Sequence, residues 1–208
     1  MPTPSEILQL ASAQANDQIA IAILWHVALA IVIVALWRGW RPSRRVAGMF
    51  LTAPIASVSL IAFEYGNPFT GIVLGLATPL LLHLASRLPD RPLPSAPAWA
   101  RVVGALLIAF GWMYPHFLHV PALYLIAAPF AVVPCPTLAV VVGFSLLAGG
   151  LGSRAWMAVV AILALFYGVV GVMQLHVWID VALVVGGFAL AMLAAAIDHA
   201  PHVLRPAR

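Results

Sequence analysis

The sequence predicts an all-α integral membrane protein, a polytopic bundle of about seven transmembrane helices. Two features of composition indicate this class: the hydrophobic fraction is 64% and the charged fraction only 8%, with a mean hydropathy of +1.07. Soluble domains are about half apolar and about a quarter charged, so this chain has too few polar residues to cover its surface in water. The third observation is a series of apolar stretches close to the roughly 20 residues that a helix needs to cross a bilayer.

The first predicted span is 19–37, and a short gap rich in arginine follows it. The second, 46–63, ends at a Gly-Asn-Pro turn, and the third, 69–84, is followed by the proline-rich loop 88–97. The remaining predicted spans are 99–114, 136–151, 156–173 and 177–197. Together they form a single membrane domain, 19–197.

The segment 116–134 is apolar but is interrupted by Pro121, Pro129 and Pro134. Each proline removes a backbone donor and disfavours helix at the residue before it. Because irregular backbone exposed to lipid is costly, we expect a segment that lies at the membrane interface or re-enters against protein. A complete extra helix is the alternative.

All ten basic residues are arginines, and they lie in or next to the gaps after the first, third, fifth and seventh predicted spans. The positive-inside rule then places these gaps in the cytoplasm. The polar segment 1–18 is expected outside and the tail 198–208 in the cytoplasm, with the chain in the bacterial cytoplasmic (inner) membrane. The arginines are scattered, so the +4 net charge indicates the lipid bilayer as partner and no nucleic acid. Other membrane subunits or further copies of the chain are additional expected partners.

Most other polar residues fall at the predicted outer ends of the spans. His176 and Asp180 are four apart near the start of the last span, a spacing that puts two residues on one helical face. A carboxylate beside an imidazole serves proton relay or the outer shell of a metal site. The alternative is a pair that caps or packs at a helix start, where a carboxylate is favoured.

Several residues are weak candidates for binding a transition metal. Cys135 lies between two prolines, and a thiolate combined with imidazoles suits copper(I) or zinc. His116 and His119 are three apart and would share a face in a helix, and His176 is the fourth candidate. His26 lies deep enough in the first span to be a haem or metal ligand. The alternatives are interfacial histidines, a small buried cysteine and a buried neutral imidazole.

The cost of an isolated polar group in lipid predicts that these residues converge. A carboxylate or imidazole alone at the centre of a membrane costs about 2.5–3.5 kcal/mol on insertion scales, so such groups seek one another or water. We therefore expect one polar site at the outer leaflet. Its members are Asp180, His176, Cys135, Glu64, and His116 or His119.

The Tyr-Pro at 114–115, the Pro-Cys-Pro-Thr at 134–137 and Asp180 in the last span carry a resemblance to a known family. Over about 111–191 the chain resembles a family of bacterial multi-pass membrane proteins of unknown function, domain of unknown function 6064. The resemblance implies a membrane fold and location and no activity. The Gly-His-x-Tyr-Pro element of that family is degraded here to Leu-His-Val-Pro at 118–121.

Three function classes fit the sequence. The first is transport or permeation of an ion or small solute, because polar groups gather at one side of the bundle. The second is a non-catalytic structural or accessory subunit, with Gly168, Gly171, Gly186 and Gly187 packing against partner helices. The third is a membrane enzyme or metal-binding protein. The chain has no P-loop, dinucleotide fingerprint, HExxH or CxxC, which disfavours an enzyme.

Overall fold

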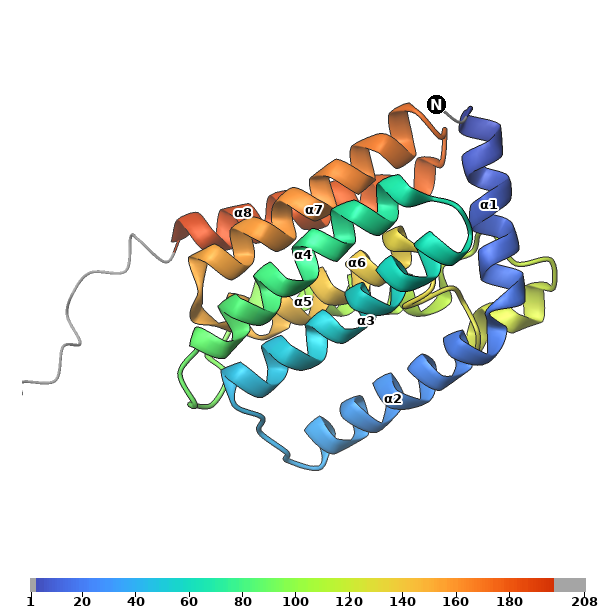
Figure 1. Ribbon diagram of the computed structural model, residues 1–208. Coiled ribbons are helices and arrows are strands. Elements are labelled where there is room, and N and C mark those ends of the chain that lie inside the picture. Colours follow the sequence, from blue (N-terminus) through green and yellow to red (C-terminus); the bar gives the residue numbers. More distant parts are fainter. Residues whose placement is uncertain (1–2, 197–208) are drawn as a thin grey trace, which may run out of the picture.

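The computed structural model describes residues 3–196. In this part the chain forms eight α-helices and three short 3-10 helices, drawn in Figure 1. The predicted tail 198–208, with its two arginines, lies outside the described residues. The helices are α1 (Pro4–Asp17), α2 (Ile19–Trp37), α3 (Arg44–Glu64), α4 (Pro68–Arg87), α5 (Ala98–Met113), α6 (Pro134–Leu147), α7 (Arg154–Met173) and α8 (Val181–Ala196), and the 3-10 helices are η1 (Pro121–Leu125), η2 (Gly149–Gly152) and η3 (Trp178–Asp180).

Five helical segments are long and apolar enough to cross a membrane: α2, α3, α4, α7, and η3 with α8. The two others that were predicted as spans, α5 and α6, are shorter apolar helices. The fold is therefore an all-α bundle with five candidate membrane spans, and the apolar stretches that the sequence marks lie in α2 through α8 in order.

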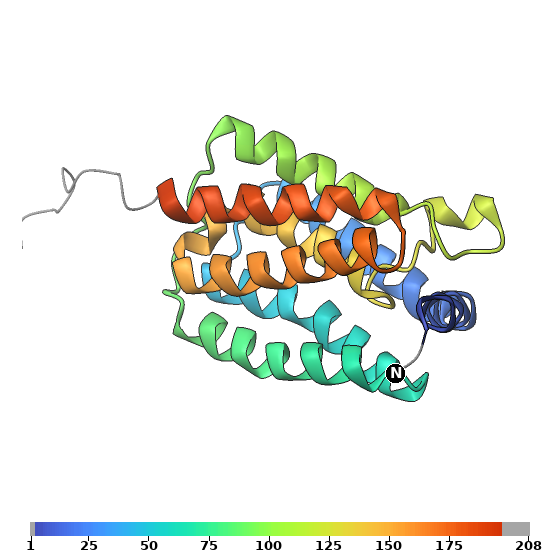
Figure 2. The same ribbon diagram turned by 90° about the horizontal axis from the view of Figure 1, so that it is seen from above.

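Helix α6 is the centre of the bundle, with α5 and α8 against one side and α3 and α7 against others (Figure 2). Its residues are apolar on every face and almost all buried, as expected for a helix surrounded by others. Gly104 of α5 and Gly143 of α6 let the two backbones meet, since a Cβ at either position would lie 2.6 Å from the carbonyl oxygen of the other.

The N-terminal segment forms a helix, α1, which we did not predict. Thr3 caps it: the Thr3 hydroxyl accepts from the Glu6 amide, and the Glu6 carboxylate accepts from the Thr3 amide. Polar side chains on α1 fasten it to the irregular segment after α5. Asn16 donates to the Phe117 carbonyl oxygen at 2.8 Å. Gln14 donates to the Val132 carbonyl oxygen at 2.6 Å. The helix thus lies across one end of the bundle (Figure 1).

The proline-rich segment between α5 and α6 is irregular apart from η1, so the complete extra helix is excluded. Residues 127–133 are buried beneath other parts of the chain. Protein covers this irregular backbone, and local hydrogen bonds such as Val133 N–H to the Pro129 carbonyl oxygen satisfy it.

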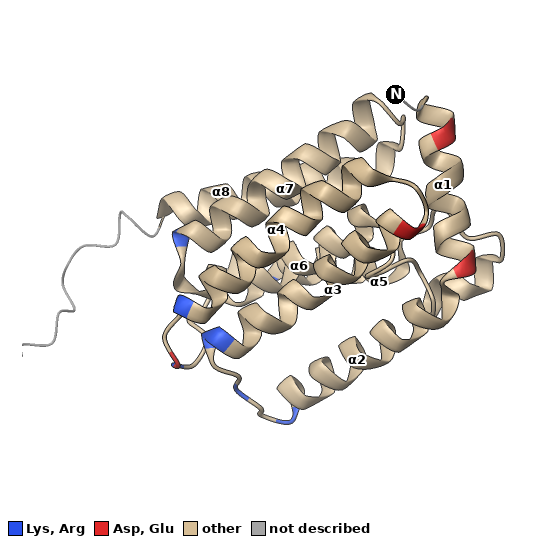
Figure 3. Ribbon diagram, in the orientation of Figure 1, with Lys and Arg blue, Asp and Glu red and all other residues tan. Residues whose placement is uncertain are grey.

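Charged residues lie at opposite ends of the bundle (Figure 3). Arginines mark the end where α2 and α4 finish and α3 and α7 begin, while Glu6, Asp17 and Glu64 mark the other. Asp90, in the loop between α4 and α5, is an acid at the arginine end.

Candidate functional site

A buried carboxyl group lies near the end of the bundle opposite the arginines. Asp180, the last residue of η3, is 1% exposed. The Tyr114 hydroxyl donates a hydrogen bond of 2.7 Å to its Oδ1 atom. The Cys135 thiol interacts with the same carboxyl group. We call Tyr114, Cys135 and Asp180 the Asp180 cluster; its members come from the end of α5, the start of α6 and the start of the last span.

The local sequence explains how these side chains meet. Tyr114 ends α5 because Pro115 follows it, and Cys135 lies in the first turn of α6, where prolines are tolerated. Gly171 of α7 provides the space for the carboxyl group, since a Cβ there would collide with the Asp180 side chain. The close packing of Asp180 against α7 therefore depends on a glycine at position 171.

A second tyrosine extends the cluster toward α4. Tyr167 of α7 is buried, and its hydroxyl has no hydrogen-bond partner, the only such buried side-chain oxygen or nitrogen in the part of the chain described. Its polar neighbours are the Thr70 and Cys135 side chains, with Thr70 outside good hydrogen-bond geometry. Buried polar groups are normally paired, so an unpaired hydroxyl beside the Cys135 thiol marks a place where a further polar partner fits.

Strained backbone lies next to each part of the cluster. Among the described residues that are not glycine, a positive φ occurs at Phe117 (81°), Ala131 (61°), Leu151 (55°) and His176 (56°). Three of these lie within four residues of Tyr114, Cys135 or Asp180 along the chain. Such conformations cost about 1–3 kcal/mol each and concentrate at functional sites and switch regions.

His176 does not share a helical face with Asp180. It is exposed in the turn between α7 and η3, because the last span begins only at Trp178 and the chain turns back at His176 with a positive φ. Although His176 and Asp180 are four residues apart, they do not lie on one helical face as we expected. Glu64, the final residue of α3, is also exposed, and its carboxylate has no hydrogen bond or ion pair to another described residue.

The two histidines after α5 lie beside α1. His116 is half-buried, its ring packs edge-on against Phe117 at 4.4 Å, and burial lowers its pKa. It lines a groove of about 350 Å³ with Leu8, Gln9 and Ser12 of α1. His119 is exposed, and its backbone amide donates to Asn16. Among the described residues, neither side chain is hydrogen-bonded to the Asp180 cluster.

His26 is buried against α5. Its Nδ1 atom lies 2.8 Å from the Ala22 carbonyl oxygen and its Nε2 atom 3.0 Å from the Trp112 carbonyl oxygen. Each ring nitrogen thus lies against a backbone carbonyl oxygen. Within residues 3–196, no group of three or more His, Cys, Asp or Glu side chains is placed to hold a metal ion.

The structure thus brings together Asp180 and Cys135 from the expected set and adds Tyr114 and Tyr167. From the sequence, Tyr114 was noted in the Tyr-Pro pair that carries the resemblance and not as a member of the site, and Tyr167 was not noted. A usable signal for Tyr114 was its position before Pro115, which fixes the helix end beside the proline-rich segment.

Comparisons of the chain with protein-family models, curated proteins and solved structures found no match. The resemblance to domain of unknown function 6064 therefore stays a prediction.

Proposed function

We propose that the chain is a seven-span protein of the bacterial cytoplasmic membrane, with its N-terminus outside, that moves an ion or small solute. Asp180 binds and releases a proton during this movement. The observation that carries the proposal is a carboxyl group buried within a spanning segment and without a cationic partner among the described residues. Ionisable groups in membrane spans are rare, and they commonly belong to ion pathways and proton relays.

Two further features support this proposal. The unpaired Tyr167 hydroxyl of α7 extends the polar cluster from Cys135 toward Thr70 of α4. The strained turns at Phe117, Ala131 and His176 adjoin the cluster, and strained segments are suited to switching between two arrangements. A switch of this kind would connect the buried Asp180 carboxyl group with water during transport.

Proton flux into proteoliposomes tests the proposal. Purified protein is reconstituted with a pH-sensitive dye inside, and an acid pulse is applied outside. We expect the wild type to acidify the lumen faster than empty liposomes do, and Asp180→Asn to lose this flux. Asp90→Asn, which changes an exposed loop acid, is the matched control and should keep it. Equal flux through folded wild type and Asp180→Asn contradicts the role of Asp180.

A structural or accessory subunit is the second candidate, and tight internal packing favours it. The glycines that we expected to face partner helices instead pack within the chain. A Cβ at Gly168 would meet Val184, and one at Gly187 would meet Leu165. A bundle packed this closely around the Asp180 cluster suits a rigid subunit, and no proton flux is expected from it.

A further inference from the structure

Helix α2 is packed against the bundle along only half of its length. Its buried residues are Ala22, His26 and Leu29, which form one stripe in its first three turns. Leu29 packs with Phe130, Ala131 and Val140, and His26 adds its contact with the Trp112 carbonyl oxygen. Only 17% of the α2 span is buried, against 33–50% of the other four long spans. The second half of α2 therefore stands away from the bundle.

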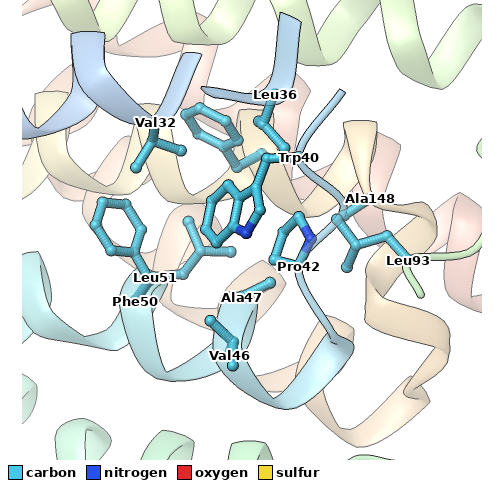
Figure 4. Close-up of a pocket in the computed structure, with 11 residues that line it drawn as sticks. Val32, Leu36, Trp40, Pro42, Val46, Ala47, Phe50, Leu51, Leu93 and Ala148 are labelled. Atoms are coloured by element: carbon cyan, nitrogen blue, oxygen red, sulfur yellow. The ribbon is translucent and has the colours of Figure 1, made fainter. Parts of the chain in front are cut away.

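Apolar grooves flank this second half on both sides. The narrower groove lies between α2 and α3 and is closed by Trp40 and Pro42 of the following linker (Figure 4). The wider groove, of about 400 Å³, lies between α2 and the α5–α6 pair, and its lining includes Ile33, Ala105 and Ala109. The two share Leu36 and Phe144. We call them together the α2 groove. The volume of the wider part lies in the range of ligand pockets, about 300–1,000 Å³.

Free positive charge surrounds the arginine end of the α2 groove. Arg38 follows α2 directly, two residues beyond Leu36, and Arg101 lies one turn before Ala105 on the same face of α5. Both are exposed, and neither guanidinium group has a hydrogen bond or ion pair to another described residue. Arg41, in the linker, donates only to backbone carbonyl oxygens of Leu36 and Trp40. Figure 3 shows the charge of this end as almost wholly positive.

We propose that the α2 groove binds an anionic phospholipid. One acyl chain lies in the wider part, between α2 and the α5–α6 pair, and the phosphate is bound by Arg38 and Arg101. The apolar lining of the α2 groove suits an acyl chain, and the unpaired arginines at its end suit a negatively charged headgroup. Basic pockets between spans on the cytoplasmic side are known to bind anionic headgroups. The inference does not depend on Asp180 or on proton movement.

Native mass spectrometry of the protein in detergent tests the headgroup part of the proposal. Phosphatidylglycerol and phosphatidylethanolamine with identical acyl chains are added in equal amounts. We expect the wild type to retain phosphatidylglycerol several-fold more, and Arg38→Gln to reduce that preference several-fold. Arg87→Gln is the control, because Arg87 is also an exposed arginine at a helix C-terminus but lies on α4, away from the groove. Equal retention of both lipids by the wild type, or equal effects of the two substitutions, overturns the proposal.

A pair of tryptophan substitutions tests the groove itself. Ala109→Trp fills the wider part, whereas Leu106→Trp adds bulk to a lipid-facing position of α5 outside the groove lining. We expect Ala109→Trp to remove most bound phosphatidylglycerol and Leu106→Trp to leave it, with unchanged melting temperatures for both. Lipid retention unaffected by Ala109→Trp overturns the proposal. A dimer that Ala109→Trp dissociates would also overturn it, because the occupant would then be a second copy of the chain.

Discussion

Gly171 and Asp180 illustrate how one missing side chain positions a functional group. The Asp180 carboxyl group occupies the volume that a Cβ at position 171 would need. Its hydrogen bond with Tyr114 and its contact with Cys135 both depend on that placement. The Asp180 cluster is thus held together by close packing at Gly171 as well as by polar contacts.

Gly171→Ala should therefore destabilise the fold. The new methyl group must push the Asp180 side chain away from Tyr114, and overpacking of this kind costs about 1–3 kcal/mol. The measurement is thermal unfolding in detergent, followed by tryptophan fluorescence. Ala158→Val, which adds bulk to an exposed position of the same helix, should leave the unfolding temperature nearly unchanged. A Gly171→Ala variant as stable as the wild type would show that the carboxyl group moves freely.

The sequence was enough to predict that Asp180 and Cys135 lie together. It was not enough to predict that Glu64 and His176 lie outside the Asp180 cluster. Burial cost correctly drives a carboxyl group inside a span toward other polar groups. Glu64 and His176 escape this cost because each lies where a helix has ended and its side chain is exposed. The last span was predicted to start at 177, whereas η3 starts at Trp178 and α8 only at Val181, so His176 lies in a turn and on no helical face.

Among the elements, α1 has the clearest mechanical role. It bonds to both ends of the segment that separates α5 from α6, through Asn16 at Phe117 and Gln14 at Val132. This segment carries the turn after Tyr114 and leads into Cys135. Helix α1 therefore holds in place the backbone next to the Asp180 cluster.

Removal of the Asn16 side chain should loosen this hold. Asn16→Ala loses the bond to the Phe117 carbonyl oxygen and the acceptor for the His119 amide, so the partly buried carbonyl keeps only the Ser12 hydroxyl as a donor. We expect faster hydrogen exchange in α1 and in residues 116–120, with α6 unchanged. Gln9→Ala, at an exposed α1 position without a hydrogen bond, is the control. Identical exchange in both variants would mean that α1 is held by its apolar contacts alone.

Helix α1 was missed because the helices were predicted from long apolar stretches, and the N-terminal segment is polar. Its capping box, Thr3 with Glu6, is nevertheless present in the sequence and was the usable sign. The apolar spans were easier to predict, since their length is imposed by the bilayer. The first predicted span, 19–37, has the bounds of α2. The irregular path of 116–134 was also foreseen from its prolines, though not that α1 would fasten it.

For the whole molecule, the distribution of charge predicts the orientation in the membrane. The arginine end of the bundle should face the cytoplasm, and the end that carries α1 should face outward. A reporter enzyme that is active only outside the cytoplasm should be active when inserted in the loop between α3 and α4, near Asn67. The same reporter in the loop between α4 and α5, near Asp90, should be inactive. The reverse pattern would contradict this orientation.

The central claim is that the Asp180 cluster opens during function, and Cys135 provides a direct way to test it. Cys135 is the only cysteine in the chain, it is buried, and it contacts Asp180. A carrier whose Asp180 cluster opens exposes this thiol in part of its cycle, whereas a rigid structural subunit keeps it covered.

The measurement is the rate at which a membrane-impermeant maleimide labels Cys135 from the outer side of intact spheroplasts, with labelling in denaturant as the total. Our account predicts slow but complete labelling of the folded protein, at a rate that changes in Asp180→Asn. A thiol that stays unlabelled until the protein unfolds, in both wild type and variant, would contradict the account.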